Sequence, residues 1–129
     1  MQDLTQKSRF TSDELYTLMC YATRANAQVC YVRGKLCDTL DNFFREVSAA
    51  LRFPDYFGWN WAAFDECLSD LEWLSFSEIL IIIQDFDYIF KNENQPDSYR
   101  DLLVKYLNIS IDYWRDQDIP IVVYLNQSY

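Results

Sequence analysis

The run Glu78–Gln84 constrains the fold of this 129-residue chain more than any other segment. Between its polar ends stand four isoleucines and a leucine, with no polar residue among them. An unbroken apolar run of this length is typical of a strand that is buried on both faces, as in a parallel sheet. Because parallel strands need long crossover connections, usually helical, the run predicts an α/β fold.

The segments on either side of this run fit the same fold class. Residues 28–36 form a second predicted strand, which closes at Gly34, and residues 119–125 form a third. Between the strands, we expect one helix that begins after Asp38, a second from about Trp59 to Leu71, and a long helix over residues 97–115. The order strand, helix, helix, strand, helix, strand predicts parallel strands joined by helical crossovers.

The N-terminal part of the chain adds one more predicted helix. Thr11–Glu14 has the pattern of a capping box, and apolar side chains follow at helical spacing from Leu15 to Ala22. We therefore expect residues 1–26 to be a helical extension of one domain that spans residues 1–129. The length and the 50% hydrophobic content suit a single domain with a substantial core rather than a disordered chain.

The charge of the chain is concentrated in one stretch. The protein has 20 acidic and 11 basic residues, a net charge of −9, and Phe53–Phe90 holds eight acids with no lysine or arginine. Such a local negative field attracts a basic partner and speeds its association. It repels nucleic acid and anionic membranes, so we expect no direct binding to either.

The predicted helix from Trp59 to Leu71 separates its apolar and polar side chains. Large apolar groups recur at helical spacing and form one stripe, made of Trp61, Phe64, Leu68 and Leu71. The opposite face carries small and acidic residues: Ala62, Asp65, Glu66, Ser69 and Asp70. Carboxylates this close repel one another unless a cation comes between them. An acidic face of this kind is either simply solvated or a site for a basic partner.

The segment Tyr56–Leu68, Tyr-Phe-Gly-Trp-Asn-Trp-Ala-Ala-Phe-Asp-Glu-Cys-Leu, resembles the barstar family of intracellular inhibitors of barnase-type ribonucleases. The similarity comprises an aromatic pair, then Gly-x-Asn, then a helical stretch that ends in acid-Cys-Leu. Leu51-x-Phe-Pro54 before it also matches. The close match covers roughly 20 residues, and a looser match in element order extends from Ala27 to Leu125. The resemblance implies a small three-stranded parallel sheet packed on helices, here with an extra N-terminal helix.

The resemblance also implies how the protein works: in that family, this loop and helix face plug the active site of the nuclease. The central carboxylate, which replaces an RNA phosphate among the enzyme's cations, falls on Glu66, where the family usually has Asp. A second family carboxylate falls on Ala62 and is lost, and an aromatic contact falls on Asp65. The implied contact residues are Tyr56, Phe57, Gly58, Asn60, Ala62, Asp65, Glu66, Ser69 and Asp70.

The tryptophans and Asp85-x-Asp87 have other possible uses. We expect Trp61 in the core, whereas Trp59 either contacts the partner or packs locally. An aromatic platform for nucleic acid needs lysine or arginine nearby, and this stretch has neither. Asp85 and Asp87 are the best candidates for a metal site, but such pairs usually stand at solvated strand ends. We expect no metal and no other cofactor.

Composition argues against an enzyme. Without histidine there is no imidazole base and no Ser-His or Cys-His pair. The two glycines, Gly34 and Gly58, cannot form a glycine-rich phosphate loop. The spacings of the four cysteines fit no Cys-x-x-Cys zinc or redox pattern, and we expect Cys67 to be a buried thiol. No signal peptide is apparent, so we expect a cytoplasmic protein.

These observations predict a binding protein rather than a catalyst. We expect a stoichiometric inhibitor that binds a basic ribonuclease toxin 1:1 and serves as its immunity protein. The alternative is an acidic module of the same kind whose basic partner is not a ribonuclease.

Overall fold

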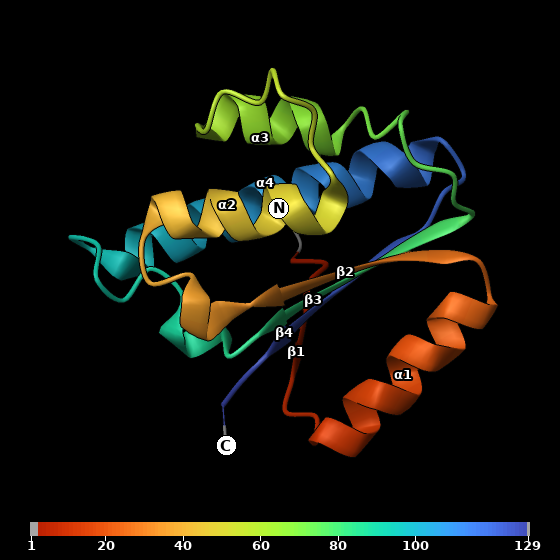
Figure 1. The fold of residues 1–129 in the computed structure, drawn as a ribbon, viewed down its shortest axis with the longest axis horizontal. Coiled ribbons are helices and arrows are strands. Elements are labelled where there is room, and N and C mark those ends of the chain that lie inside the picture. The colour runs from red at the N-terminus through yellow and green to blue at the C-terminus, as the bar shows by residue number, and fades with distance from the viewer. Residues whose placement is uncertain (1–2, 129) are drawn as a thin grey trace.

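A computed structural model describes residues 3–128 and shows four parallel strands in one sheet, with helices on both faces (Figure 1). The strand order is β1-β4-β3-β2. The strands are β1 (Gln6–Ser8), β2 (Ala27–Arg33), β3 (Glu78–Gln84) and β4 (Ile121–Asn126). The predicted α/β class is confirmed, but the expected three strands are four, because β1 pairs with β4 along one edge.

Strand β3 lies in the middle of the sheet and explains the unbroken apolar run. It pairs with β2 on one side and β4 on the other. Leu80 and Ile82 face a small cluster under α1, while the side chains of Ile79, Ile81 and Ile83 belong to the main core on the other face. Apolar contact on both faces is why this strand has no alternating polar positions.

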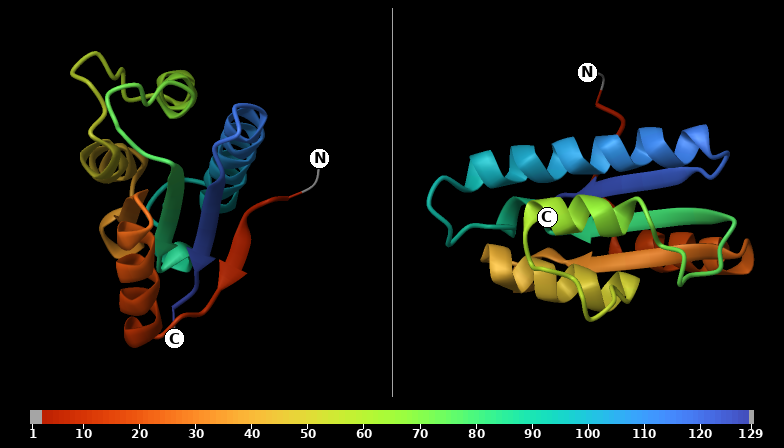
Figure 2. Two further views of the ribbon diagram at one scale, coloured as in Figure 1. Left: turned by 90° about the vertical axis from the view of Figure 1, so that its right-hand side faces the viewer. Right: turned by 90° about the horizontal axis from the view of Figure 1, so that it is seen from above.

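Four α-helices cover the sheet unequally. They are α1 (Ser12–Arg24), α2 (Leu40–Leu51), α3 (Trp61–Leu68) and α4 (Pro96–Asp116), with short 3₁₀ turns at Gly34–Leu36 and Phe86–Tyr88. Helices α2 and α4 pack on one face and α1 on the other (Figure 1). Helix α3 lies above α2 and α4, on the side away from the sheet (Figure 2). None of the helices within residues 3–128 is both long and apolar enough to cross a membrane.

Two predicted helix boundaries differ from the structure. Thr39, not Asp38, caps α2, because its hydroxyl accepts from the Asn42 backbone N–H at 3.2 Å. The Asp38 carboxylate instead accepts from the side-chain amides of Asn42 and Asn92, at 2.8 and 2.7 Å. Helix α3 is shorter than the predicted range, since Asn60 caps its start and Ser69 its end.

The capping box of α1 is confirmed. The Thr11 hydroxyl accepts from the Glu14 backbone N–H at 3.2 Å, and the Glu14 carboxylate accepts from the Thr11 N–H at 3.0 Å. Leu15 and Ala22 point into the sheet and are buried. Helix α1 therefore belongs to the folded body, where it covers the β2–β3 side of one sheet face (Figure 2).

Candidate functional site

The loop between α2 and α3 turns sharply because of two residues with left-handed backbone. Arg52 ends α2 with φ 54°, and the next N–H, of Phe53, donates to the Ser48 carbonyl at 2.9 Å. This is a common way to end a helix and reverse the chain. A second turn follows, in which the Phe57 N–H donates to the Pro54 carbonyl at 2.9 Å, and Trp59 then adopts φ 52°.

The aromatic side chains of this loop point in different directions. Tyr56 is 66% exposed and Trp59 is 42% exposed, whereas Phe57 is only 7% exposed. The Phe57 ring packs on Phe44 and Phe53, with centroids 5.6 and 4.9 Å apart. Phe57 thus differs from its expected place on the partner-facing rim, because the turn at Pro54 directs its ring into the core. Its role in the structure is to anchor the loop.

Trp59 shows the local packing that is one of its two predicted roles, and contact with a partner stays a prediction. The guanidinium of Arg45, on α2, lies 5.8 Å from the centroid of its ring, within the range of a cation–π contact. The indole therefore packs locally and still exposes much of its surface. Nothing in the sequence near Trp59 points to Arg45, which lies on the preceding helix and reaches the loop only in the fold.

Trp61 lies on the inner side of α3, as expected. Its ring stacks on Tyr106 of α4 at 5.5 Å with an interplanar angle of 9°, and it also packs against Phe43, Phe44 and Phe64. These contacts hold α3 over the two helices beneath it. The buried members of the α3 stripe are Phe64, Leu68 and, just beyond the helix, Leu71; Cys67 is buried beside them.

Asn60 links the loop to the helix. Its side-chain oxygen accepts from the Ala63 N–H at 2.8 Å, which caps α3, and its amide donates to the Gly58 carbonyl at 3.0 Å. Both bonds are internal to the protein, so the amide group fixes Gly58 and the start of α3 in one geometry. Gly58 itself is exposed.

The outer face of α3 carries the predicted acidic surface. Ala62 and Glu66 are exposed, and Asp65, Ser69 and Asp70 are half-buried. Among residues 3–128, the ion pairs involve Glu46, Asp97 and Asp112, all outside the stretch 53–90. One Asp65 carboxylate oxygen is buried without a hydrogen-bond partner. Charge on this face is therefore available to an external cation rather than consumed by internal pairing.

Tyr56 lies close to the end of this acidic face. Desolvation, followed by the nearby charges of Asp70, Cys67 and Glu72, raises the pKa of its phenol above the ordinary value. The tyrosine and the acidic face thus form one continuous surface. Glu72 also contributes to this surface, although it was not among the predicted contact residues. Its position in the stretch 53–90, which has no lysine or arginine, is the sequence signal that could have identified it.

Asp85 and Asp87 lie at the end of β3 and bind the C-terminal segment. Asp85 accepts from the Ser128 hydroxyl at 2.7 Å, and Asp87 accepts from the Ser128 N–H at 3.0 Å. Within residues 3–128, no three metal-ligating side chains gather into a group that could hold an ion. These two carboxylates therefore have a structural use in the fold.

Comparison with known proteins identifies the family of the chain. The sequence model described as Barstar (barnase inhibitor) matches residues 27–126, which include β2, β3, β4 and helices α2 to α4. A search among curated proteins gave no match. Since the matched region covers most of the chain, the protein belongs to the barstar (barnase inhibitor) family, with β1 and α1 placed before the matched region.

Proposed function

We propose that this protein is a stoichiometric inhibitor of a basic ribonuclease, and that it acts as the immunity protein of a toxin–antitoxin pair. The observation that carries the proposal is the outer face of α3, where Glu66 is exposed among unpaired carboxylates in a stretch without lysine or arginine. Family membership supports an inhibitory role of this general kind.

The proposed mechanism is occlusion with phosphate mimicry. The cations of a ribonuclease active site bind RNA phosphates, and a carboxylate that enters such a site makes short charge-assisted hydrogen bonds with the same cations. Glu66 is the central group in this proposal, with Asp65 and Asp70 beside it. Tyr56 and Trp59 cover the rim of the cleft from the adjoining loop. Substrate is excluded because the helix and loop occupy its place.

The remaining residues of the proposed site hold this surface in shape. Phe57 anchors the loop, and Asn60 fixes Gly58 against the start of α3. Ala62 and Ser69 offer small side chains that let the helix approach a partner closely. A surface held this firmly loses little conformational freedom on binding, which favours affinity.

Two departures from the family pattern bear on the choice of target. Ala62 lacks the second carboxylate, and Glu66 reaches one methylene further than the usual Asp. A cleft that fits this surface needs its cations spaced differently from those of barnase. The general mode, an acidic helix in a basic cleft, is unaffected by these departures. The alternative proposal is a basic partner that is not a ribonuclease, such as a DNA-cleaving toxin, bound in the same mode.

The unpaired state of the cysteines fits a reducing environment. Cys20, Cys30, Cys37 and Cys67 are all free thiols, and three of them are buried. Unpaired buried thiols are typical of proteins that function in reducing compartments. We therefore place this inhibitor in the cytoplasm as part of the proposal.

The test is capture of the partner from the native cell, followed by an RNA-cleavage assay on the captured protein with and without inhibitor. We expect a basic ribonuclease in a 1:1 complex, and loss of cleavage at equimolar inhibitor. The Glu66→Lys variant should fail to capture or inhibit. Asp101→Lys makes the same charge change at an exposed position on α4 and should behave as wild type. A captured partner that cleaves only DNA would select the alternative.

A further inference from the structure

Helix α1 lies on the sheet face opposite the candidate site and presents an unusual amount of aromatic surface. Tyr16 and Tyr21 are each 73% exposed, the highest values among the large hydrophobic side chains of the described residues. The helix precedes the region matched by the family model. The proposed inhibitory mechanism gives these two tyrosines no role.

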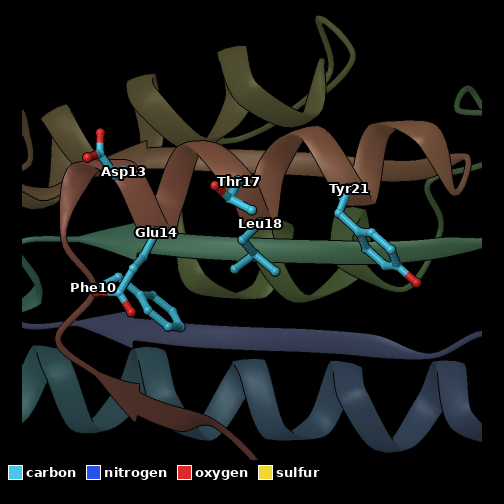
Figure 3. Close-up of a pocket in the computed structure, with 6 residues that line it drawn as sticks. All are labelled: Phe10, Asp13, Glu14, Thr17, Leu18 and Tyr21. Atoms are coloured by element: carbon cyan, nitrogen blue, oxygen red, sulfur yellow. The ribbon is translucent and has the colours of Figure 1, made fainter.

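A surface hollow flanks α1 on each side. The first, of about 570 Å³, is lined by Phe10, Asp13, Glu14, Thr17, Leu18 and Tyr21 (Figure 3). The second, of about 410 Å³, is lined by Tyr16, Met19, Cys20, Thr23 and Arg24. At about 100° per residue, Tyr16 and Tyr21 point to opposite flanks of the helix. Helix α1 is therefore a ridge with a tyrosine and a hollow on each flank.

This arrangement is self-complementary under a twofold axis. Suppose that two copies of α1 pack antiparallel through their exposed faces, with the twofold axis between Leu18 and Met19. Tyr16 of each helix then lies at the same height along the helix axis as Tyr21 of the other. The axis keeps each flank facing the same flank of the second copy. Tyr16 then reaches the hollow that is centred near Cys20, and Tyr21 reaches the hollow that is centred near Thr17. An interface in which one patch contacts its own copy is the hallmark of twofold dimers.

Charges on the same ridge are complementary in this register. Asp13 and Arg24 lie along the outermost line of the helix, three turns apart, and both are exposed. The twofold axis places Asp13 of each copy beside Arg24 of the other. Two symmetric ion pairs would close the ends of the interface, around the tyrosines at its centre.

From this geometry we propose that α1 is a self-association surface, through which two copies of the protein pair with antiparallel α1 helices. Helix α3 and the loop before it, which carry the proposed inhibitory surface, lie on the other side of the sheet, so both inhibitory surfaces stay free in the dimer (Figure 1). Two 13-residue helices bury less area than a standard interface, so the dimer forms at micromolar or higher concentration.

The positions of Asp13 and Arg24 have a second physical explanation, which the experiment must distinguish from dimerisation. An acid in the first turn and an arginine in the last turn also complement the dipole of a single helix. That effect acts within one copy and needs no dimer. Reversing both charges together distinguishes the two explanations, because it restores the intermolecular pairs while it worsens both interactions with the dipole.

The experiment is sedimentation equilibrium of the full chain from about 1 µM to 1 mM, for wild type and three variants. Asp13→Arg and Arg24→Asp should each weaken the dimer roughly tenfold, because each turns two exposed attractions into repulsions. The double variant should recover wild-type dimerisation. Circular dichroism of each variant checks that α1 stays folded.

Cys20 supplies an independent readout, since the other three cysteines are buried. A short bismaleimide should join the Cys20 thiols of two copies, and the Cys20→Ser variant should give no product. Cross-linking should fall in the single reversals and return in the double. The proposal is overturned if the protein stays monomeric up to about 1 mM, or if neither single charge reversal changes the dissociation constant of the dimer.

Discussion

At the scale of single residues, the candidate surface depends on side chains that point outward because their neighbours point inward. Tyr56 and Trp59 are exposed, while Phe57 between them is buried against Phe44 and Phe53. Asn60 uses both of its amide groups within the loop. The loop is therefore held from inside, and a partner meets a preformed surface rather than a mobile one.

Glu66→Ala should weaken the complex with the ribonuclease more than any other single removal of a carboxylate. Removing one member of a desolvated, hydrogen-bonded charge pair costs on the order of 2–5 kcal/mol. Asp55→Ala, nearer the edge of the surface, should cost less than about 1 kcal/mol. Isothermal titration calorimetry measures both. Equal losses would show that the central carboxylate is not Glu66.

Buried thiols make the folded protein sensitive to alkali. Burial, with a smaller contribution from the charge of Glu46, raises the pKa of the Cys30 thiol from its ordinary 9.0 to about 12, and burial raises that of Cys37 to about 12 as well. The unfolded chain releases these protons at lower pH than the folded one. The thiols therefore leave stability unchanged below pH 9 and lower it progressively from pH 9 to 12.

We expect each of these two thiols to lower the free energy of unfolding by roughly 1.4 kcal/mol per pH unit within that window. Urea unfolding at several pH values between 8 and 11.5 measures the slope. The Cys30→Ala variant should begin less stable, because a buried group is lost, but its slope should be smaller. An unchanged slope would mean that Cys30 does not titrate in this range on unfolding.

At the scale of elements, two buried asparagines fix the N-terminal segment to the family core. Asn108 of α4 accepts from the Leu4 N–H at 2.6 Å, and Asn126 of β4 accepts from the Phe10 N–H at 2.6 Å. Asn126 also accepts from the Ser8 hydroxyl and donates to Gln84. These bonds hold β1 at the edge of the sheet and set where α1 begins.

Asn126→Ala should loosen β1 without unfolding the central strands. A buried amide with this many partners leaves unsatisfied groups behind when it is removed, which costs about 1–3 kcal/mol. Hydrogen exchange of the Ser8 and Phe10 amides should accelerate more than that of amides in β3. Asn92→Ala removes an exposed asparagine and serves as the control. Equal protection of β1 in both variants would contradict the role given to Asn126.

At the scale of the whole molecule, the charge is distributed unevenly over the surface. The net charge is −9, and the stretch 53–90 holds eight acids and no base. Helix α3 lifts much of this stretch above α2 and α4, on the outermost layer of the molecule (Figure 2). A basic partner is therefore attracted to the same side that carries the proposed contacts.

Association with the ribonuclease should depend steeply on salt. The field acts over about 8–10 Å near physiological ionic strength, so raising salt from about 50 to 500 mM should slow association at least about tenfold. Dissociation should change much less, because short-range contacts are screened little. Stopped-flow fluorescence measures both rates.

The variant with Asp70→Lys and Glu72→Lys together should flatten the salt dependence of association, even if neither side chain touches the partner. Asp112→Lys with Asp116→Lys makes an equal change of charge near the C-terminal end of α4 and should leave the dependence steeper. If association of the wild type is indifferent to salt, the acidic stretch only solubilises the protein, and phosphate mimicry loses its physical basis.

The sequence by itself determined the features that a local pattern of residues specifies. The apolar run of β3 predicts a strand covered on both faces, the Thr11–Glu14 pattern predicts the start of α1, and the segment 56–68 predicts the family. Each of these depends on periodicity, capping or a local pattern, which act over a few neighbouring residues.

Only the tertiary structure decided the rest. Strand β1 is three residues, Gln-Lys-Ser, with no strand pattern; it exists because β4 and Asn126 offer partners more than 100 residues away in the chain. The burial of Phe57 follows from the turns after Arg52, and Arg45 meets Trp59 only once α2 lies beside the loop. Contacts between distant segments depend on the path of the backbone between them, and no local pattern encodes that path.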